Sequence, residues 1–147
     1  MSLFFEVPGQ PVGKARPRFT RTGHAYTPKK TTDYEAAVRK AFRIAYPNHE
    51  PFTGAVSIEV YAFFAIPPSW PKWKREKAAE GQVPHLSKPD GSNVLKGVED
   101  AIGPRRHGRK VIPGLAYVDD SQITDAGIQK RYATRPRVEV NITEGKE

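Results

Sequence analysis

The chain has 147 residues, 37% of them hydrophobic and 27% charged, which is typical of one soluble domain with a proper core. The absence of cysteine excludes disulfides and thiolate metal sites. No apolar run is long enough to span a bilayer and no secretory signal begins the chain, so we expect a cytoplasmic protein. The formal net charge of +8 favours a polyanionic partner such as nucleic acid, although a merely soluble basic protein would share it.

Three regular elements are predicted in the first half of the chain. Residues 3–7 are predicted to form a strand, because aromatic and β-branched residues predominate there. An amphipathic helix is predicted from about residue 33 to residue 46, with Thr31 or Thr32 as its cap. Apolar residues alternate with period two over residues 55–66, so we expect a long strand at the centre of the sheet.

A basic segment without acids, residues 13–30, precedes the first helix. Its prolines favour extended backbone, and the alternation of a strand would then place its first three cations on one side of a ribbon. Aromatic residues are interleaved with the bases, as in surfaces that clamp phosphates and stack bases. We interpret the segment as a nucleic-acid contact, with a solvated cationic edge as the alternative. The predicted contacts are Lys14, Arg16, Arg18 and Arg21.

A short helix is predicted over residues 69–81, with Ser69 as its cap and a glycine at its end. Trp70 and Trp73 are expected to dock this helix on the sheet, and base stacking is the alternative role for them. A second amphipathic helix is predicted over residues 92–102.

Three aspartates flank this second helix in the sequence. Asp90 comes just before it. Either Asp90 or Ser92 could cap the helix, so the alternative to a functional role for Asp90 is that of a simple helix cap. Residues 114–120 are predicted to form a buried strand that ends on Asp119 and Asp120. Pleating would send these two side chains to opposite faces, so only one of them can share a site with Asp90 unless the backbone bends.

The chemistry of such a group of acids is that of a Mg²⁺ site. This ion keeps several waters and is held by one or two carboxylates together with substrate phosphate. It can polarise a phosphoryl oxygen and activate water for hydrolysis. Lys96 shares a helix face with Asn93 and Asp100, and it would neutralise phosphate charge or stabilise the departing oxygen. The residues thus suggest hydrolysis of a nucleic-acid backbone, provided that the acids converge.

The connection at residues 103–114 is also basic, and we interpret it as a DNA-contacting loop, with a mobile solvent loop as the alternative. Two strands are predicted after it, over residues 122–133 and 137–143, and residues 144–147 are expected to form a frayed tail. The contacts predicted in the loop are Arg105, Arg106, Arg109 and Lys110.

Three motifs resemble the RusA family of Holliday-junction resolvases. They are Lys-Pro-Asp-Gly-Ser-Asn-Val-Leu-Lys at residues 88–96, Glu-Asp-Ala-Ile at residues 99–102 and Val-Asp-Asp-Ser-Gln-Ile at residues 118–123. Residues 11–18 are similar to the basic N-terminal segment of that family. The resemblance implies a single α+β domain over residues 1–147, with helices packed on a mixed β-sheet.

The resemblance also implies a function: a homodimer, bacterial or phage-encoded, that resolves four-way DNA junctions in recombination and repair by paired nicks with Mg²⁺ or Mn²⁺. By the same resemblance, the catalytic residues would be Asp90, Asp120 and Lys96. The metal ligands would be drawn from Asp90, Asp100, Asp119 and Asp120, and Lys88 and Asn93 would join the DNA contacts.

The chain departs from the family pattern at two places. Ser92 stands where a second aspartate is expected, and serine is a weaker, neutral ligand, so a catalytically weakened or inactive branched-DNA-binding protein is the alternative function. The connection over residues 103–114 is longer than the short turn typical of the family.

Overall fold

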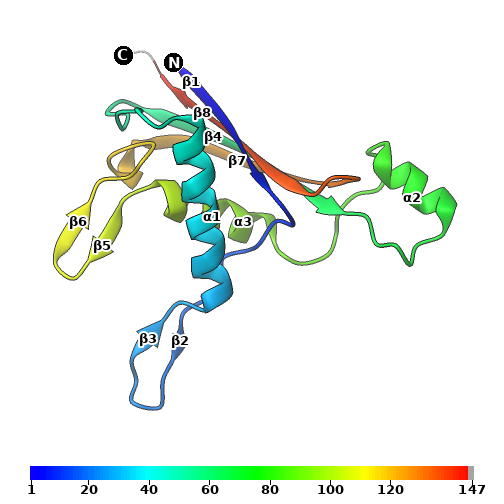
Figure 1. Ribbon diagram of the computed structural model, residues 1–147, viewed down its shortest axis with the longest axis horizontal. Helices are drawn as coiled ribbons and strands as arrows, with labels where there is room; N and C mark the ends of the chain where they lie inside the picture. The colour runs from blue at the N-terminus through cyan, green and yellow to red at the C-terminus, as the bar shows by residue number, and fades with distance from the viewer. Residues whose placement is uncertain (146–147) are drawn as a thin grey trace.

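A four-stranded mixed sheet lies at the centre of the molecule (Figure 1). The computed structural model describes residues 1–145. The strand order is β1-β8-β4-β7, in which β8 pairs antiparallel with β1 and β4, and β7 pairs parallel with β4. The strands are β1 (Ser2–Pro8), β4 (Val56–Ala65), β7 (Ile123–Ala133) and β8 (Arg137–Glu144). The predicted α+β class and the interior position of the long strand β4 are both confirmed.

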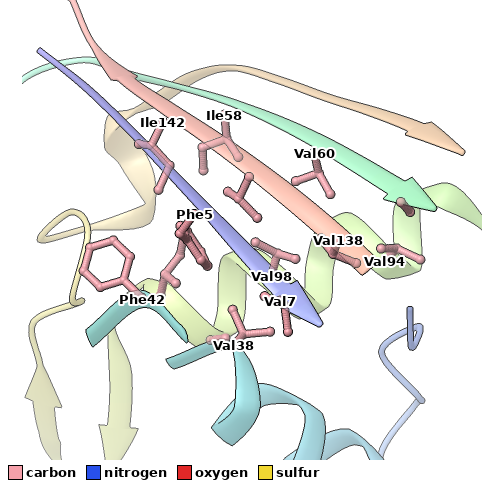
Figure 2. Close-up of a cluster of buried hydrophobic side chains, with 14 of the residues drawn as sticks. Phe5, Val7, Val38, Phe42, Ile58, Val60, Val94, Val98, Val138 and Ile142 are labelled. Atoms are coloured by element: carbon pink, nitrogen blue, oxygen red, sulfur yellow. The ribbon is translucent and has the colours of Figure 1, made fainter. Parts of the chain in front are cut away.

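One face of the sheet is covered by two helices, α1 (Lys29–Ala45) and α3 (Gly91–Ile102). Alternate residues of β1, β4 and β8 point toward these helices and are almost fully buried. Figure 2 shows Val38 and Phe42 of α1 and Val94 and Val98 of α3 packed against the strand side chains. Burial of these apolar stripes, worth about 1.5–3 kcal/mol per large side chain, fixes both helices on the sheet.

Both of the predicted helix caps in the first half of the chain are wrong. α1 begins at Lys29, four residues earlier than expected, and Pro28 precedes it without a side-chain cap. Thr31 lies within the first turn, where its hydroxyl accepts a hydrogen bond from the backbone of Ala15 instead. Helix α2 (Lys72–Ala79) likewise begins after Pro71, because proline has the backbone angle that starts a helix and lacks the N–H that needs a cap.

The prediction for the two tryptophans is half confirmed. The ring of Trp70 packs edge-on against Tyr132 of β7, with 5.0 Å between ring centroids, and so docks the segment before α2 on the sheet. Trp73 lies on α2 itself and is 61% exposed. Helix α2 lies beyond one end of the sheet, away from the two hairpins at residues 18–26 and 105–112 (Figure 1).

Two small exposed hairpins project from the other end of the molecule (Figure 1). One is formed by β2 (Arg18–Phe19) and β3 (Ala25–Tyr26), the other by β5 (Arg105–His107) and β6 (Lys110–Ile112). The extended backbone predicted from the prolines is seen as strand only at Arg18–Phe19 and Ala25–Tyr26, so the cations before them do not form one continuous strand. The predicted loop over residues 103–114 is a hairpin, turned at Gly108, whose φ of 65° favours glycine.

Residues 114–120 do not form the predicted strand. Tyr117 makes only an isolated bridge with Phe52, and the chain then turns into a short 3₁₀ helix, η1 (Asp120–Gln122). Ala116 and Tyr117 of this segment are buried because the segment crosses the end of the core, whereas Val118 is exposed. The predicted fraying at Glu144 is also wrong, since its carboxylate accepts hydrogen bonds from the backbone of Thr53 and Gly54. Residues 146–147 of the predicted tail lie outside the described residues.

The two ends of the β5–β6 hairpin meet at a pair of buried glycines. A Cβ added at Gly114 would overlap the backbone oxygen of Tyr117 and would lie 2.7 Å from the backbone of Gly103. The backbone N–H of Ala116 donates to Ile102 at the same place. The hairpin is thus anchored to the end of α3 and to the segment that leads to Asp120. Within residues 1–145, no helix combines the length and the apolar character that crossing a bilayer requires.

This close approach makes the position intolerant of a side chain. Gly114→Ala should lower the free energy of unfolding by about 3 kcal/mol, because the added methyl group meets backbone on two sides. Gly108→Ala, at the open tip of the same hairpin, should cost only about 1 kcal/mol of backbone strain. Urea denaturation of both variants measures the difference, and equal losses would contradict the anchoring role of Gly114.

Candidate active site

The segment after β1 crosses over the N-terminal half of α3 and holds it. The backbone N–H of Lys14 donates to the carbonyl of Asn93 at 2.9 Å. Gly13 lies so close to Pro89 that a Cβ there would be 2.6 Å from the Cβ of Pro89. The absence of a side chain at Gly13 therefore allows the segment to reach the space between α1 and α3.

Lys14 joins the two helices through a chain of charges. Its ammonium lies 2.8 Å from Asp100 of α3 and 3.2 Å from Glu35 of α1, which is buried. Lys96 reaches the other carboxylate oxygen of Asp100 at 3.3 Å, one helical turn away. The predicted role of Lys14 was contact with nucleic acid, but its ammonium is occupied by two protein carboxylates.

The partners of Lys14 set its ionisation. Burial lowers the pKa of Lys14, but the hydrogen bond and charge of Asp100, together with Glu35, outweigh that effect, so the pKa is raised above its ordinary value. Lys14 is therefore positively charged throughout the physiological range. Without it, Glu35 would be a buried carboxylate with no counter-charge, which is strongly unfavourable.

An acidic group lies beside the C-terminal half of α3. Burial raises the pKa of Asp120, and repulsion from Asp100 and Asp119 adds to the rise against the opposing effect of Lys96. Burial raises the pKa of Glu99 in the same way, with repulsion from Asp100 and Asp120. These shifts show that Glu99, Asp100 and Asp120 share one electrostatic environment with Lys96. Glu99 was not among the predicted site residues, although it stands directly before Asp100.

Asp119 holds the turn that presents Asp120. Its carboxylate accepts hydrogen bonds from the backbone and the hydroxyl of Ser121, and these bonds lower its pKa. The side chain of Gln122 accepts from the backbone of Asp119 and donates to the carbonyls of Phe52 and Gly54. This reciprocal capping box bends the backbone between the two aspartates, so the alternation assumed for a strand does not apply there.

Asp90 lies at the opposite end of α3. It occupies the N-cap position but makes no capping hydrogen bond, so the capping role considered for it is not seen. Its carboxylate pairs instead with Lys88 at 3.0 Å. The loop before it is fastened by Lys130 of β7, whose ammonium donates to the carbonyls of Ser87 and Pro89 at 2.8 Å. Lys130 is therefore a positioning residue for Asp90 that the sequence motifs did not single out.

Two of the predicted acids stand at different heights along α3, Asp90 at its N-cap and Asp100 near its end. Asp90 and Asp100 are ten residues apart on one helix, a rise of about 15 Å. The charges that shift the pKa of Asp120 are those of Lys96, Asp100 and Asp119, so Asp120 lies near the stretch of α3 from Lys96 to Asp100. Within residues 1–145, no group of three or more acidic or histidine side chains is arranged to hold a metal ion.

The acids beside Lys96 nevertheless fit a hard divalent cation by their chemistry. Asp100 and Asp120 supply oxygen donors, and the charge of Asp100 destabilises the charged form of Asp120, a repulsion that a cation would relieve. One or two carboxylates are sufficient for Mg²⁺, whose other ligands are water and substrate phosphate. Asp119 fits less well, because its carboxylate already accepts hydrogen bonds from Ser121. The salt bridge from Lys88 likewise engages Asp90.

The other predicted DNA contacts lie on the surface. Lys88 is exposed, as is the side chain of Asn93 on the first turn of α3. Both hairpins are exposed along their whole length, and the aromatic rings of Phe19 and Tyr26 lie open on the first of them. The exposed cations are Arg16, Arg18 and Arg21 in or next to the first hairpin and Arg105, Arg106, Arg109 and Lys110 in the second.

Comparison with known proteins supports the sequence resemblance. The family model described as Endodeoxyribonuclease RusA matches residues 8–143 of this chain. The uncharacterised protein YqaN of Bacillus subtilis strain 168 is 36% identical over 148 residues. That match covers 95% of this chain and 94% of YqaN, so the two proteins correspond over almost their whole lengths.

The charge chain through Lys14 yields a test of stability. Lys14→Met should lower the free energy of unfolding by about 2 kcal/mol at neutral pH, because Glu35 and Asp100 lose their shared cation. The matched control is Lys29→Met, which removes an exposed pair with Asp33 at 3.9 Å and should change stability little.

The ion pairs of Lys14 also predict how the free energy of unfolding depends on pH. Because the folded pKa of Lys14 is raised, its contribution is fully present below the ordinary value of 10.5 and is lost as pH rises through the folded pKa. Urea denaturation from neutral to strongly alkaline pH should show this loss in the wild type and in Lys29→Met, but not in Lys14→Met. An identical alkaline loss in all three proteins would contradict the assignment.

Proposed function

Because the chain belongs to the RusA family of endodeoxyribonucleases, we propose that it is a metal-dependent nuclease that resolves four-way DNA junctions by paired nicks. The observation that carries the proposal is the acidic group of Asp100 and Asp120 beside Lys96, in which Asp100 also lines a cleft with Arg105 and Arg106 of the cationic β5–β6 hairpin. Junction resolution of this kind belongs to DNA recombination and repair, and we expect the protein to act in the cytoplasm of a bacterium, whether the gene is bacterial or phage-borne.

In the proposed site, Asp100 and Asp120 hold a Mg²⁺ ion, with Mn²⁺ as a substitute. The bound ion supplies positive charge that polarises the scissile phosphate. The capping box around Asp119 keeps Asp120 in place during the reaction. Asp90 is proposed to contribute its carboxylate to the same reaction from the beginning of α3.

Lys96 is the proposed electrostatic catalyst. Its side chain is 60% exposed, and its pair with Asp100 is a surface salt bridge that contributes little to stability. The ammonium can therefore leave Asp100 for a phosphate oxygen at small cost. A cation at that place stabilises the negative charge that develops on the departing oxygen.

The exposed cations of the hairpins are proposed to bind the DNA backbone without regard to sequence. Lys88 and Asn93 would extend this surface along α3, and the open rings of Phe19 and Tyr26 offer stacking faces for unpaired bases. Lys14 does not take part in these contacts, because its ammonium is already paired.

A homodimer suits this substrate. A four-way junction is nearly two-fold symmetric, and two identical protomers can each address one of the opposed strands. Sedimentation of the free protein and of its junction complex tests this part of the proposal, which predicts two protomers per junction.

Substitution of the acids tests the catalytic assignment. Asp120→Asn should abolish Mg²⁺-dependent nicking of a four-way junction and leave binding intact, because the amide keeps the shape of the carboxylate but not its charge. Asp90→Asn should have the same effect. Asp125→Asn, which changes an exposed acid of β7, is the control and should nick at the wild-type rate. Gel assays of nicking and of binding measure both properties, and nicking by both Asp120→Asn and Asp90→Asn would remove the assignment.

A second candidate function is that of a branched-DNA-binding protein with weak or no cleavage. It is favoured by Ser92, which stands on the first turn of α3 where an acid is expected, and by the absence of a three-acid cluster within residues 1–145.

Substitution of Ser92 tests this second candidate function. If the protein binds junctions without cleaving them, Ser92→Asp should create or strongly increase nicking in Mg²⁺, because it adds a charged oxygen ligand near Asp90. Ser92→Asn has a similar size without the charge and should leave the rate unchanged. Efficient nicking by the wild type would rule this candidate out.

A further inference from the structure

A cleft of about 430 Å³ lies between α1 and the base of the β5–β6 hairpin. Its walls carry Arg39 of α1, Arg105 and Arg106 of the hairpin, and Asp100 of α3. Thr27 and Thr32 add hydroxyl groups from the segment that begins α1. Arg39 was not among the predicted contacts, because in the sequence it belongs to an ordinary amphipathic helix.

The charges of the cleft do not cancel. Its two acids, Glu35 and Asp100, share the ammonium of Lys14, and Asp100 also pairs with Lys96. Within the described residues 1–145, the guanidinium groups of Arg39, Arg105 and Arg106 form no salt bridge with an acid. Three cations therefore face a space whose negative charges are already neutralised.

The environment of Arg39 reflects this surplus. Burial lowers the pKa of Arg39, and repulsion from Arg105 and Arg43 adds to the effect, against the opposing charge of Glu35. Like charges held this close are unfavourable unless an anion lies between them. The sequence separation of Arg39 and Arg105 means that the fold itself brings them together.

We propose that this cleft is a phosphate-binding site, with Arg39 as its central ligand and Arg105 and Arg106 closing over the bound group from the hairpin. Guanidinium groups bind phosphate oxygens in pairs through their planar fork, and threonine hydroxyls donate to the oxygens that remain. The volume accommodates a phosphodiester together with its sugar.

The identity of the phosphate rests on the proposed function. Asp100 forms part of the wall of the cleft and also belongs to the acidic group around Asp120. A DNA strand whose phosphate lies at Asp120 would therefore place a neighbouring phosphate in the cleft. In this arrangement, Arg39 fixes the register of the strand and takes no part in the chemistry.

The test compares Arg39→Gln with Lys40→Gln. Lys40 is the next residue of α1, is exposed and lies outside the cleft, so its substitution removes the same charge from the same helix. The first measurement is the melting temperature in inorganic phosphate against chloride at equal ionic strength. The second is affinity for a four-way junction in EDTA over a range of salt concentrations, where no cleavage is needed.

We expect phosphate to stabilise the wild type and Lys40→Gln but not Arg39→Gln. Junction affinity of Arg39→Gln should fall about tenfold at low salt, the loss of one charge-assisted contact. The slope of log affinity against log salt should become shallower by about 0.9, as for one phosphate contact with duplex DNA. If Arg39→Gln does not fold, Arg105→Gln on the exposed hairpin takes its place.

Three outcomes would overturn the proposal or part of it. Phosphate stabilisation that persists in Arg39→Gln refutes the cleft as a phosphate site, even if the wild type nicks junctions. Equal losses in Lys40→Gln refute it too, since they show only a general effect of charge. Loss of phosphate stabilisation with unchanged junction binding refutes DNA as the source of the phosphate. If phosphate stabilises the wild type but not Arg39→Gln, and the wild type does not nick junctions, the phosphate site is supported and the nuclease is refuted.

Discussion

The arrangement of the site depends on the ammonium of Lys14, which lies between Glu35 of α1 and Asp100 of α3. The two helices share one face of the sheet, and this cation joins their polar sides above the apolar core. The ammonium of Lys14 also lies at the boundary between two parts of the surface. On one side, Asp100 faces Asp120 and Lys96; on the other, it forms part of the wall of the arginine-rich cleft. A single charge thus separates a region suited to a cation from one suited to an anion.

The sequence was sufficient for the parts of the fold that follow from periodicity. Alternation over β4 and β8 gave their bounds to within a residue or two, and the apolar stripe of α3 gave that helix. These elements are defined by which side they bury, and this is a local property of the chain. The motif around Asp90 and Lys96 also indicated the family, which the comparison with known proteins confirms.

The errors arose where distant contacts override local patterns. Residues 114–120 are as apolar as a strand, yet they bridge to Phe52 at one point only and then turn, because Gln122 bonds to the carbonyls of Phe52 and Gly54. Lys14 looked like one member of a basic row, but its partners come from two helices later in the chain. No spacing in the sequence indicates that Arg39 and Arg105 meet. The convergence of Asp90 with Asp120 was inferred from the motif and stays a prediction: Asp90 stands at the beginning of α3, and Asp120 is influenced by the charges of Lys96 and Asp100.

The two adjacent aspartates at the start of η1 have pKa values shifted in opposite directions. Hydrogen bonds from Ser121 lower the pKa of Asp119, whereas burial and neighbouring acids raise the pKa of Asp120. On acidification, Asp120 therefore takes up a proton first, while the carboxylate of Asp119 still closes the turn. Asp120 can lose its charge while the turn keeps its shape, so a return to neutral pH restores this carboxylate without any refolding of the backbone around it.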